Sequence, residues 1–181
     1  MTTTMTMTRA LPRPHSLLLC AALLAMPLAC DGGTKTAAPS DAVGQAAPAL
    51  AGQDLSGAPV SLAELRGKVV IVDFWASWCE PCEAAMPTLE GLSRAYGEAL
   101  VIVGVSVDED EAAMREFAER VAVSFHLVHD LDHAIADAWA PPKMPTTYVI
   151  DRAGNVAAVQ AGYDEAAEGR LRAAIDRALA D

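Results

Sequence analysis

The chain has 181 residues, of which 52% are hydrophobic, and its 24 acidic and 13 basic side chains give a formal net charge of −11 at pH 7. This length predicts one domain of ordinary size. The acidic balance, with no cluster of Lys or Arg, excludes nucleic-acid binding, because that function needs a basic surface against the phosphates. Four cysteines in an exported chain would allow two structural disulfides, so their positions decide what they do.

Residues 1–29 have the pattern of a signal peptide. They contain no acidic residue, carry Arg9 and Arg13, and run apolar from Leu17 to Ala29, interrupted by Pro27. The run is shorter than the roughly 20 apolar residues that a membrane-spanning helix needs. Export is therefore favoured over a transmembrane anchor, and Cys20 leaves with the peptide.

Leu28-Ala29-Cys30, followed by Asp31, resembles a bacterial lipoprotein box, in which the cysteine becomes the lipidated first residue of the mature protein. The resemblance implies lipid attachment at Cys30 and a location at the membrane, facing the periplasm or the cell exterior. The alternative is a plain secretory signal cut nearby, which leaves Cys30 as a free thiol or removes it. Loss of residues 1–29 leaves 11 basic against 24 acidic side chains, a formal charge of −13, so charge does not hold the protein at anionic lipid.

Residues 30–47 are mostly small and polar, and we expect them to form a flexible tether. Such a tether would let a domain that begins at Pro48 reach partners near the membrane. Residues 48–181 are sufficient for one hydrophobic core, and we see no internal repeat among them.

Strand and helix patterns alternate along the predicted domain. A short hairpin or loose strands are expected around Leu50 to Val60. β-branched runs typical of buried strands then alternate with helical stretches. We expect strands over 69–74, 100–107, 125–128, 146–150 and 156–159, and helices over 82–96, 111–121 and 165–179. Pro87 is expected to kink the first helix. This order predicts a three-layer α/β sandwich.

Two cysteines lie three residues apart in Trp78-Cys79-Glu80-Pro81-Cys82, between the strand that ends at Phe74 and the first helix. At a helix start, unpaired N–H groups and the positive end of the dipole favour a thiolate at Cys79, and a thiolate is what attacks a disulfide. Cys82, one turn deeper, would be the resolving thiol. The alternatives are a structural disulfide, which would close too short a loop to stabilise much, and half of a zinc site, which lacks a second pair.

The segment 69–87, VVIVDFWASWCEPCEAAMP, resembles the active-site strand and helix of thioredoxin, and Met144-Pro145-Thr146-Thr147 resembles its cis-proline loop. The stretches GVSVDE and TTYVIDRAGNV, together with the region of Gly57, Leu62, Leu65, Gly67 and Lys68, are more similar to the TlpA/ResA-type branch of that superfamily. The resemblance covers about residues 46–181. It implies a thioredoxin fold, an α/β/α sandwich with a mixed central sheet and an extra N-terminal strand region. It also implies a disulfide reductase, since members of this branch are exported, often membrane-tethered reductases, and many serve cytochrome c maturation.

The resemblance also implies roles for single residues. Pro145 is expected to be cis, beside the cysteine pair, with the Met144 carbonyl and the Thr146 backbone open to a substrate strand. Asp73 matches the buried aspartate of thioredoxin. Because burial disfavours a charged carboxylate, we expect a raised pKa for Asp73 and a role in proton exchange with Cys82. The alternative is an aspartate that caps the following loop.

The two residues between the cysteines are expected to tune the redox potential. Pro81 holds the first helical turn rigid, and the Glu80 carboxylate disfavours the thiolate, so both favour a reductant over an oxidant. The third residue after the second cysteine is Ala85, where several relatives of the cytochrome c branch have a glutamate. An apocytochrome substrate is therefore a candidate only. We interpret Trp78 as a substrate contact.

A copper-binding metallochaperone of the same fold is the second function class, with the cysteine pair and His129 as ligands. Pro145 disfavours it, because a cis-proline beside the pair tends to block metal binding in this superfamily. We interpret His126, His129 and His133 as solvated side chains rather than a metal site, and Asp108 to Glu111 as a helix start rather than a calcium site. The motif also disfavours a peroxidase.

The predicted enzyme is therefore a thiol–disulfide oxidoreductase whose only redox group is the Cys79–Cys82 couple, with no cofactor or metal. Its expected partners are an exported protein that carries a disulfide and an upstream membrane thiol reductase that supplies electrons. The membrane is contacted through the Cys30 lipid, and the protein is expected to be a monomer.

Overall fold

The computed structural model describes residues 39–181, which belong to one structural unit. The predicted signal peptide, Cys30 and the first part of the tether lie outside the described residues. The elements in chain order are η1 Pro39–Ala42, β1 Ala51–Gln53, β2 Pro59–Ser61, η2 Leu62–Leu65, β3 Val69–Trp75, α1 Glu80–Tyr96, η3 Gly97–Ala99, β4 Leu100–Ser106, α2 Glu111–Val121, β5 His126–His129, α3 Ala134–Trp139, β6 Thr146–Ile150, β7 Val156–Ala161 and α4 Ala167–Ala180.

The central sheet has five strands in the order β5-β4-β3-β6-β7. The first three strands are mutually parallel, and β6 and β7 are antiparallel to their neighbours, so the sheet is mixed as expected. All seven residues of β3 are buried, because this strand lies at the centre with a covered surface on each face. The ends of β3 and β4 and the start of β6 therefore meet at one edge of the sheet.

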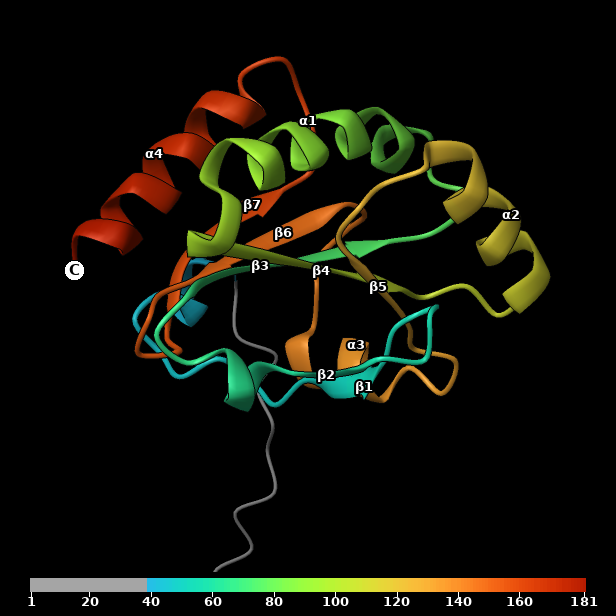
Figure 1. Cartoon of the computed structure of the whole chain (residues 1–181), viewed down its shortest axis with the longest axis horizontal. Helices are drawn as coiled ribbons and strands as arrows, with labels where there is room; N and C mark the ends of the chain where they lie inside the picture. Colours follow the sequence, from blue (N-terminus) through green and yellow to red (C-terminus); the bar gives the residue numbers. More distant parts are fainter. Residues whose placement is uncertain (1–38) are drawn as a thin grey trace, which may run out of the picture. The chain divides into compact units, whose positions relative to one another are not determined.

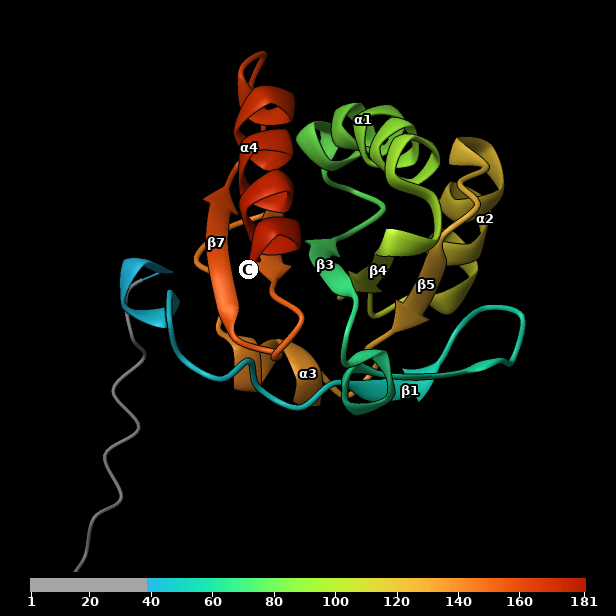
Figure 2. The same ribbon diagram turned by 60° about the vertical axis from the view of Figure 1, so that its left-hand side comes forward.

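Three layers are visible in Figures 1 and 2. Helices α1, α2 and α4 cover one face of the sheet, while α3 and the small β1–β2 sheet lie on the opposite face. The expected three-layer arrangement with an extra N-terminal strand region is therefore confirmed. None of the helices in the described part of the chain combines the length and apolar character needed to cross a membrane.

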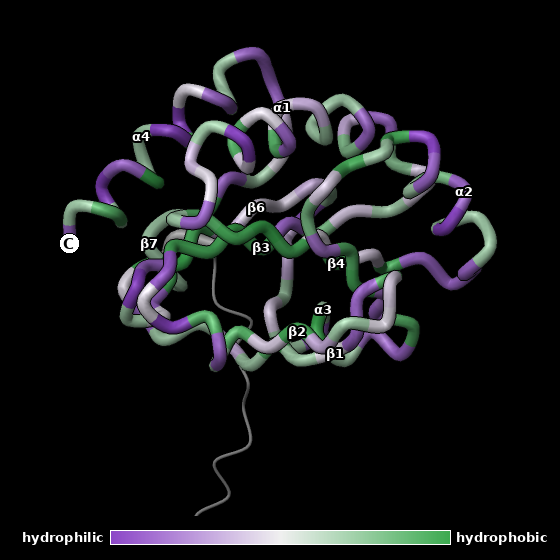
Figure 3. The backbone as a smooth tube through the Cα atoms, viewed as in Figure 1, coloured by the Kyte–Doolittle hydropathy of each residue, from purple (hydrophilic) through white to green (hydrophobic). Residues whose placement is uncertain are grey.

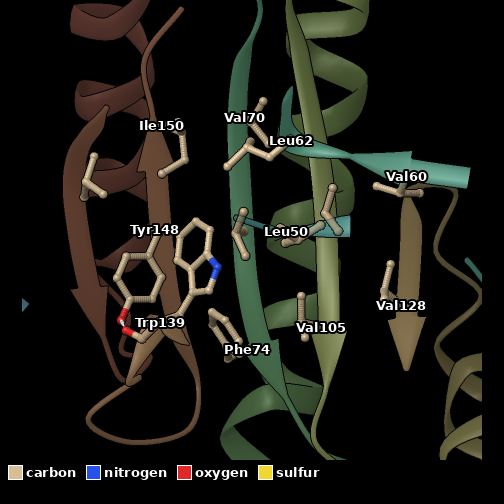
Figure 4. Close-up of a cluster of buried hydrophobic side chains, with 13 residues drawn as sticks. Leu50, Val60, Leu62, Val70, Phe74, Val105, Val128, Trp139, Tyr148 and Ile150 are labelled. Atoms are coloured by element: carbon tan, nitrogen blue, oxygen red, sulfur yellow. Dashed lines mark hydrogen bonds between the residues drawn. The ribbon is translucent and has the colours of Figure 1, made fainter. Parts of the chain in front are cut away.

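The largest apolar cluster fills the space between the sheet and the layer of α3 (Figure 4). Within it, the Trp139 ring lies 5.0 Å from the ring of Tyr148 and 5.9 Å from that of Phe74, measured between centroids. Strand β3 is apolar along most of its length (Figure 3), because both of its faces are buried. Its side chains alternate between the faces, and Val70, Val72 and Phe74 face this cluster. The other side chains of β3 face the helices, and the active site is built on that side.

The segment just before Pro48 differs from the predicted tether. The Gly44 amide donates to the Val156 carbonyl at 2.8 Å, and the Ala47 amide donates to the Gly154 carbonyl at 3.0 Å. Ala42 and Ala47 also pack against the apolar cluster under α3. The backbone of this stretch is thus paired with the turn before β7, and the folded domain starts before the boundary expected from composition.

Helix α3 is a further difference, because the sequence predicts a polar turn around His129 and His133 and no helix between that turn and the strand at 146–150. The Asp130 carboxylate accepts hydrogen bonds from the amides of Ile135 at 3.0 Å and Ala136 at 2.7 Å, and thereby satisfies the start of this short helix. His129 belongs to β5 rather than to the turn. Helix α1 begins two residues earlier than expected, at Glu80, and runs through Pro87.

Candidate active site

Cys79 and Cys82 form a disulfide at the N-terminus of α1. Cys79 is the N-cap residue, and its Sγ accepts a hydrogen bond from the Cys82 amide at 3.2 Å. Cys79 is 6% exposed, whereas Cys82 is completely buried. A substrate can therefore reach only Cys79, as the predicted roles of attacking and resolving thiol require. Pro81 lies in the first turn, where its missing N–H costs no helical hydrogen bond.

The peptide bond between Met144 and Pro145 is cis, as the resemblance implied. Met144 packs against the apolar cluster that contains both cysteines, so this loop lies beside the disulfide. The loop is held at both ends, because the Thr146 hydroxyl donates to the Lys143 carbonyl at 2.6 Å and the Gly162 amide donates to the Pro145 carbonyl at 2.7 Å. Thr146 then begins β6.

Asp73 lies in the middle of β3 and is completely buried. Its neighbours in register are Gly104 of β4 and Thr147 of β6. The Thr147 hydroxyl donates to Asp73 Oδ1 at 2.6 Å, and Oδ2 has no partner. Burial raises the pKa of Asp73 to about 7, against the smaller opposing effect of the Thr147 hydrogen bond. The raised pKa agrees with the expectation, and no hydrogen bond found for Asp73 caps a loop.

Four acidic side chains are buried in the described part of the chain, and Asp73 differs from the others. Glu90, Asp108 and Asp130 each accept several hydrogen bonds, whereas Asp73 accepts one and keeps an unpaired oxygen. Ala85, which stands where a glutamate was considered, is buried in α1. Asp73 is therefore the carboxyl group best suited to exchange a proton in the interior.

Two tryptophans flank the disulfide and differ in exposure. Trp75 is completely buried and stacks on Phe117 of α2, with ring centroids 4.8 Å apart, so it is a packing residue. Trp78 is 70% exposed, so its apolar ring is open to contact by a partner. The chain thus presents an indole directly before the reachable cysteine.

Trp78 and Met144 line an open groove of about 770 Å³. Its other walls come from the loop after β4 and from α3, and the acidic groups Glu109, Asp110 and Asp137 lie along it without a Lys or Arg. Glu80 and Glu83, which each directly follow one of the cysteines, are exposed in the first turn of α1. The surface around the disulfide is consequently acidic.

The sequence analysis did not identify Asp108 as a site residue, although it holds the loop that precedes Cys79. Its carboxylate accepts the Ser77 amide at 3.0 and 3.1 Å, the Ser77 hydroxyl at 2.6 Å and the Ser106 hydroxyl at 2.7 Å. The His129 imidazole donates to the Asp108 backbone carbonyl at 2.7 Å. The sequence did contain a signal for this contact, because Asp108 follows one predicted strand and Ser77 follows another. The carboxyl ends of neighbouring parallel strands meet at one edge of the sheet, so the two residues can be expected to lie close together.

We expect Asp108→Asn to lower the free energy of unfolding by about 2–3 kcal/mol, because it weakens several hydrogen bonds to a buried carboxylate. The matched control is Glu109→Gln, an exposed neighbour, which should change it by less than about 0.5 kcal/mol. Urea unfolding of the oxidised protein measures both effects. Equal stabilities of the two variants would contradict a structural role for Asp108.

The three histidines near β5 have separate surroundings. The His126 imidazole is hydrogen-bonded to the Asp54 carboxylate at 2.8 Å. That carboxylate also accepts hydrogen bonds from the Ser56 hydroxyl and from the amides of Ser56 and Ala58. The bonds from the Ser56 hydroxyl and from His126, with those from the two amides, lower the pKa of Asp54 well below its usual range. His129 contacts the backbone of Asp108. Among residues 39–181 there is no group of three or more potential metal-ligating side chains. No contact in this region favours the copper alternative.

Comparisons with known proteins agree with this geometry. The family model described as AhpC/TSA family matches residues 43–159. The thiol–disulfide oxidoreductase ResA of Geobacillus thermodenitrificans is 36% identical over 122 residues, which are 67% of this chain and 70% of that protein.

Two crystal structures are also similar. A Chlorobium tepidum protein assigned as the thiol:disulfide interchange protein DsbE superposes with a TM-score of 0.72 at 30% identity, over 76% of this chain and 97% of that one. A secreted Mycobacterium tuberculosis disulfide oxidoreductase, described as homologous to E. coli DsbE, gives a TM-score of 0.61 at 28% identity, over 71% of this chain and 95% of that one. With its disulfide at a helix start and its thioredoxin fold, the chain belongs to the AhpC/TSA family and is a thiol–disulfide oxidoreductase of the ResA type.

Proposed function

We propose that the protein reduces disulfides in exported proteins. The observation that carries this proposal is the Cys79–Cys82 disulfide, in which one sulfur is reachable and the other is buried beside Pro145. In the reduced protein, the Cys79 thiolate attacks a substrate disulfide and forms a mixed disulfide. The Cys82 thiolate then attacks Cys79 Sγ and releases the reduced substrate. Both electrons come from the cysteine pair, so the proposal includes no cofactor.

The acidic surroundings of Cys79 support the reductive direction. Glu80 follows Cys79 directly, and a carboxylate close to a thiol disfavours its thiolate. The groove next to Trp78 adds further acidic groups to this surface. A dithiol whose reduced form is less stabilised gives up its electrons more readily. Equilibration with glutathione is expected to give a potential nearer to about −270 mV, as in thioredoxin, than to about −120 mV, as in DsbA. A potential at the oxidising end would contradict the reductase assignment.

The groove supports a polypeptide substrate rather than a small molecule, since it is open and is lined by Trp78, the residue directly before Cys79. Trp78 offers an apolar contact, and Met144 offers its backbone carbonyl beside Pro145. Thr146, which was expected to offer a second backbone contact, is completely buried and pairs with β3 and β7. An apocytochrome c is a candidate substrate by family resemblance. A membrane thiol reductase would regenerate the dithiol. Action as a monomer is part of this proposal.

We further propose that Cys30 anchors the protein to the membrane by a lipid, facing the periplasm or the cell exterior. The support is the signal pattern that ends at Cys30, together with a similar protein that is described as secreted. Labelled palmitate is expected to enter the wild-type protein, and Cys30→Ser should lose the label. A wild-type protein that takes up no label would refute the anchor and leave the redox proposal intact.

A further inference from the structure

Thr147 lies directly opposite Asp73 in the antiparallel pair of β3 and β6. Directly opposed residues point to the same face of a sheet, and the Thr147 hydroxyl donates to Asp73 Oδ1 at 2.6 Å. Thr147 is only 5% exposed and Asp73 is completely buried, so water does not compete for this hydrogen bond. Thr147 also follows Pro145 by two residues, so the loop beside the substrate and the partner of the carboxyl group belong to one short segment.

On the side of Asp73 that faces β4, the neighbouring residue is Gly104, which has no side chain that could bond to the carboxyl group. A Cβ at Gly104 would lie 2.8 Å from Cδ2 of Leu127 and 3.0 Å from Nε1 of Trp75, so this position has no room for one. Asp73 Oδ2 accordingly has no partner, and neither has Trp75 Nε1. The two oxygens of Asp73 therefore differ, since one is a fixed acceptor and the other is free.

The groups around Asp73 are few. Thr147 faces it from β6, Gly104 adjoins it on β4, and α1 packs over this face of the sheet with Cys82 and Met86 in the cluster of Trp75. Among the described residues, no charged side chain contributes to the pKa of Asp73, which reflects burial and the Thr147 hydrogen bond alone. Once the disulfide is reduced, Cys82 is the titratable group on the helix that covers Asp73.

We propose that Thr147 is a positioning residue for the resolving step, in which it holds Asp73 Oδ1 as an acceptor and leaves Oδ2 to take the proton of Cys82. This inference rests on the proposed function. The proton of the Cys82 thiol passes to Oδ2, a bond forms between Cys82 Sγ and Cys79 Sγ, and the bond from Cys79 Sγ to the substrate sulfur breaks. The substrate leaves as a thiolate and takes a proton from water, so two electrons pass from the cysteine pair to the substrate over the whole reaction.

The test compares Thr147→Val, which removes the hydroxyl at nearly constant volume, with Thr147→Ser, which keeps it. Two quantities are measured: the pH dependence of disulfide reduction, and the titration of the Asp73 carboxyl carbon by NMR in the oxidised protein. Loss of a hydrogen bond to the charged form favours the neutral acid. Thr147→Val should therefore move both midpoints upward by about one pH unit, and Thr147→Ser should return them to the wild-type value.

A purely structural role for Thr147 would lower stability and leave both midpoints in place, and that result in a folded Thr147→Val protein overturns the proposal. Thr147→Ala serves if the valine variant does not fold. In an Asp73→Asn background, the valine substitution should not change the pH profile further, and a remaining shift would also overturn it. If the wild-type protein reduces no protein disulfide, the proposed function fails, while the NMR titration still decides whether Thr147 controls the carboxyl group.

Discussion

Cys82→Ala is expected to trap the substrate on Cys79 as a stable mixed disulfide, and Cys79→Ala is expected to lower disulfide reduction at least about 10³-fold. The difference follows from position, because Cys79 is the sulfur that a substrate can reach and Cys82 is buried behind it. Without Cys79 no attack begins. Without Cys82 the attack occurs, but the mixed disulfide has no internal thiol to resolve it.

The trapping experiment is done in a Cys20→Ser, Cys30→Ser background, so that Cys79 is the single thiol of the Cys82→Ala chain whether or not residues 1–29 are removed. Adducts are separated under non-reducing conditions, and the attached protein is identified by mass spectrometry. A variant with both Cys79→Ala and Cys82→Ala is the control and should trap nothing. Full reductase activity in Cys79→Ala would contradict the assigned nucleophile.

Asp73→Asn is expected to stabilise the folded, oxidised protein at pH 8 by roughly 3–4 kcal/mol. The folded protein holds the Asp73 proton up to a pKa of about 7, whereas the ordinary pKa of an aspartate is 3.8. Between these pH values the folded state binds the extra proton, so the stability of the wild type falls as pH rises. Above pH 7 this loss is complete. An asparagine does not titrate, so the Asp73→Asn variant does not lose this stability as pH rises.

Urea unfolding at pH 4 and pH 8 measures this effect. The two proteins should differ much less at pH 4, where Asp73 is neutral when folded, and should diverge as pH rises. Glu98→Gln, at an exposed carboxylate, is the control and should follow the wild type. Asp73→Asn should also slow the resolving step, since the asparagine takes up no proton from Cys82. A wild-type stability that tracks the variant across this range would contradict the raised pKa of Asp73.

The sheet and the cysteine pair could be predicted from the sequence because their signals are local. The run from Val69 to Trp75 is apolar apart from Asp73, which marks both a central strand and its one exceptional residue. The short spacing of Cys79 and Cys82 after that strand fixes their place at a helix start. The cis bond at Pro145 came from family resemblance, since nothing in the local sequence distinguishes it from an ordinary trans proline.

The features that sequence reasoning missed depend on contacts between distant segments. Residues 44–47 carry no strand or helix signal, and they are ordered by packing of Ala47 and by hydrogen bonds to a segment more than a hundred residues later. In the sequence, Asp108 does not differ from the other acidic residues of its run. Its role depends on the contact with Ser77, which only the fold brings close to it. Thr147 gains its proposed role from the strand register, which sequence patterns do not specify.

The burial of Cys82 has a kinetic consequence, because every electron that enters or leaves the protein has to pass through Cys79. The proposed electron donor and the substrate cannot be attached at the same time, since they exchange with the same sulfur atom. The two half-reactions therefore alternate, as in a ping-pong scheme, and an excess of one partner inhibits turnover of the other. The groove must bind the electron donor and the substrate in turn. Its shape therefore cannot be specific for only one of these two partners.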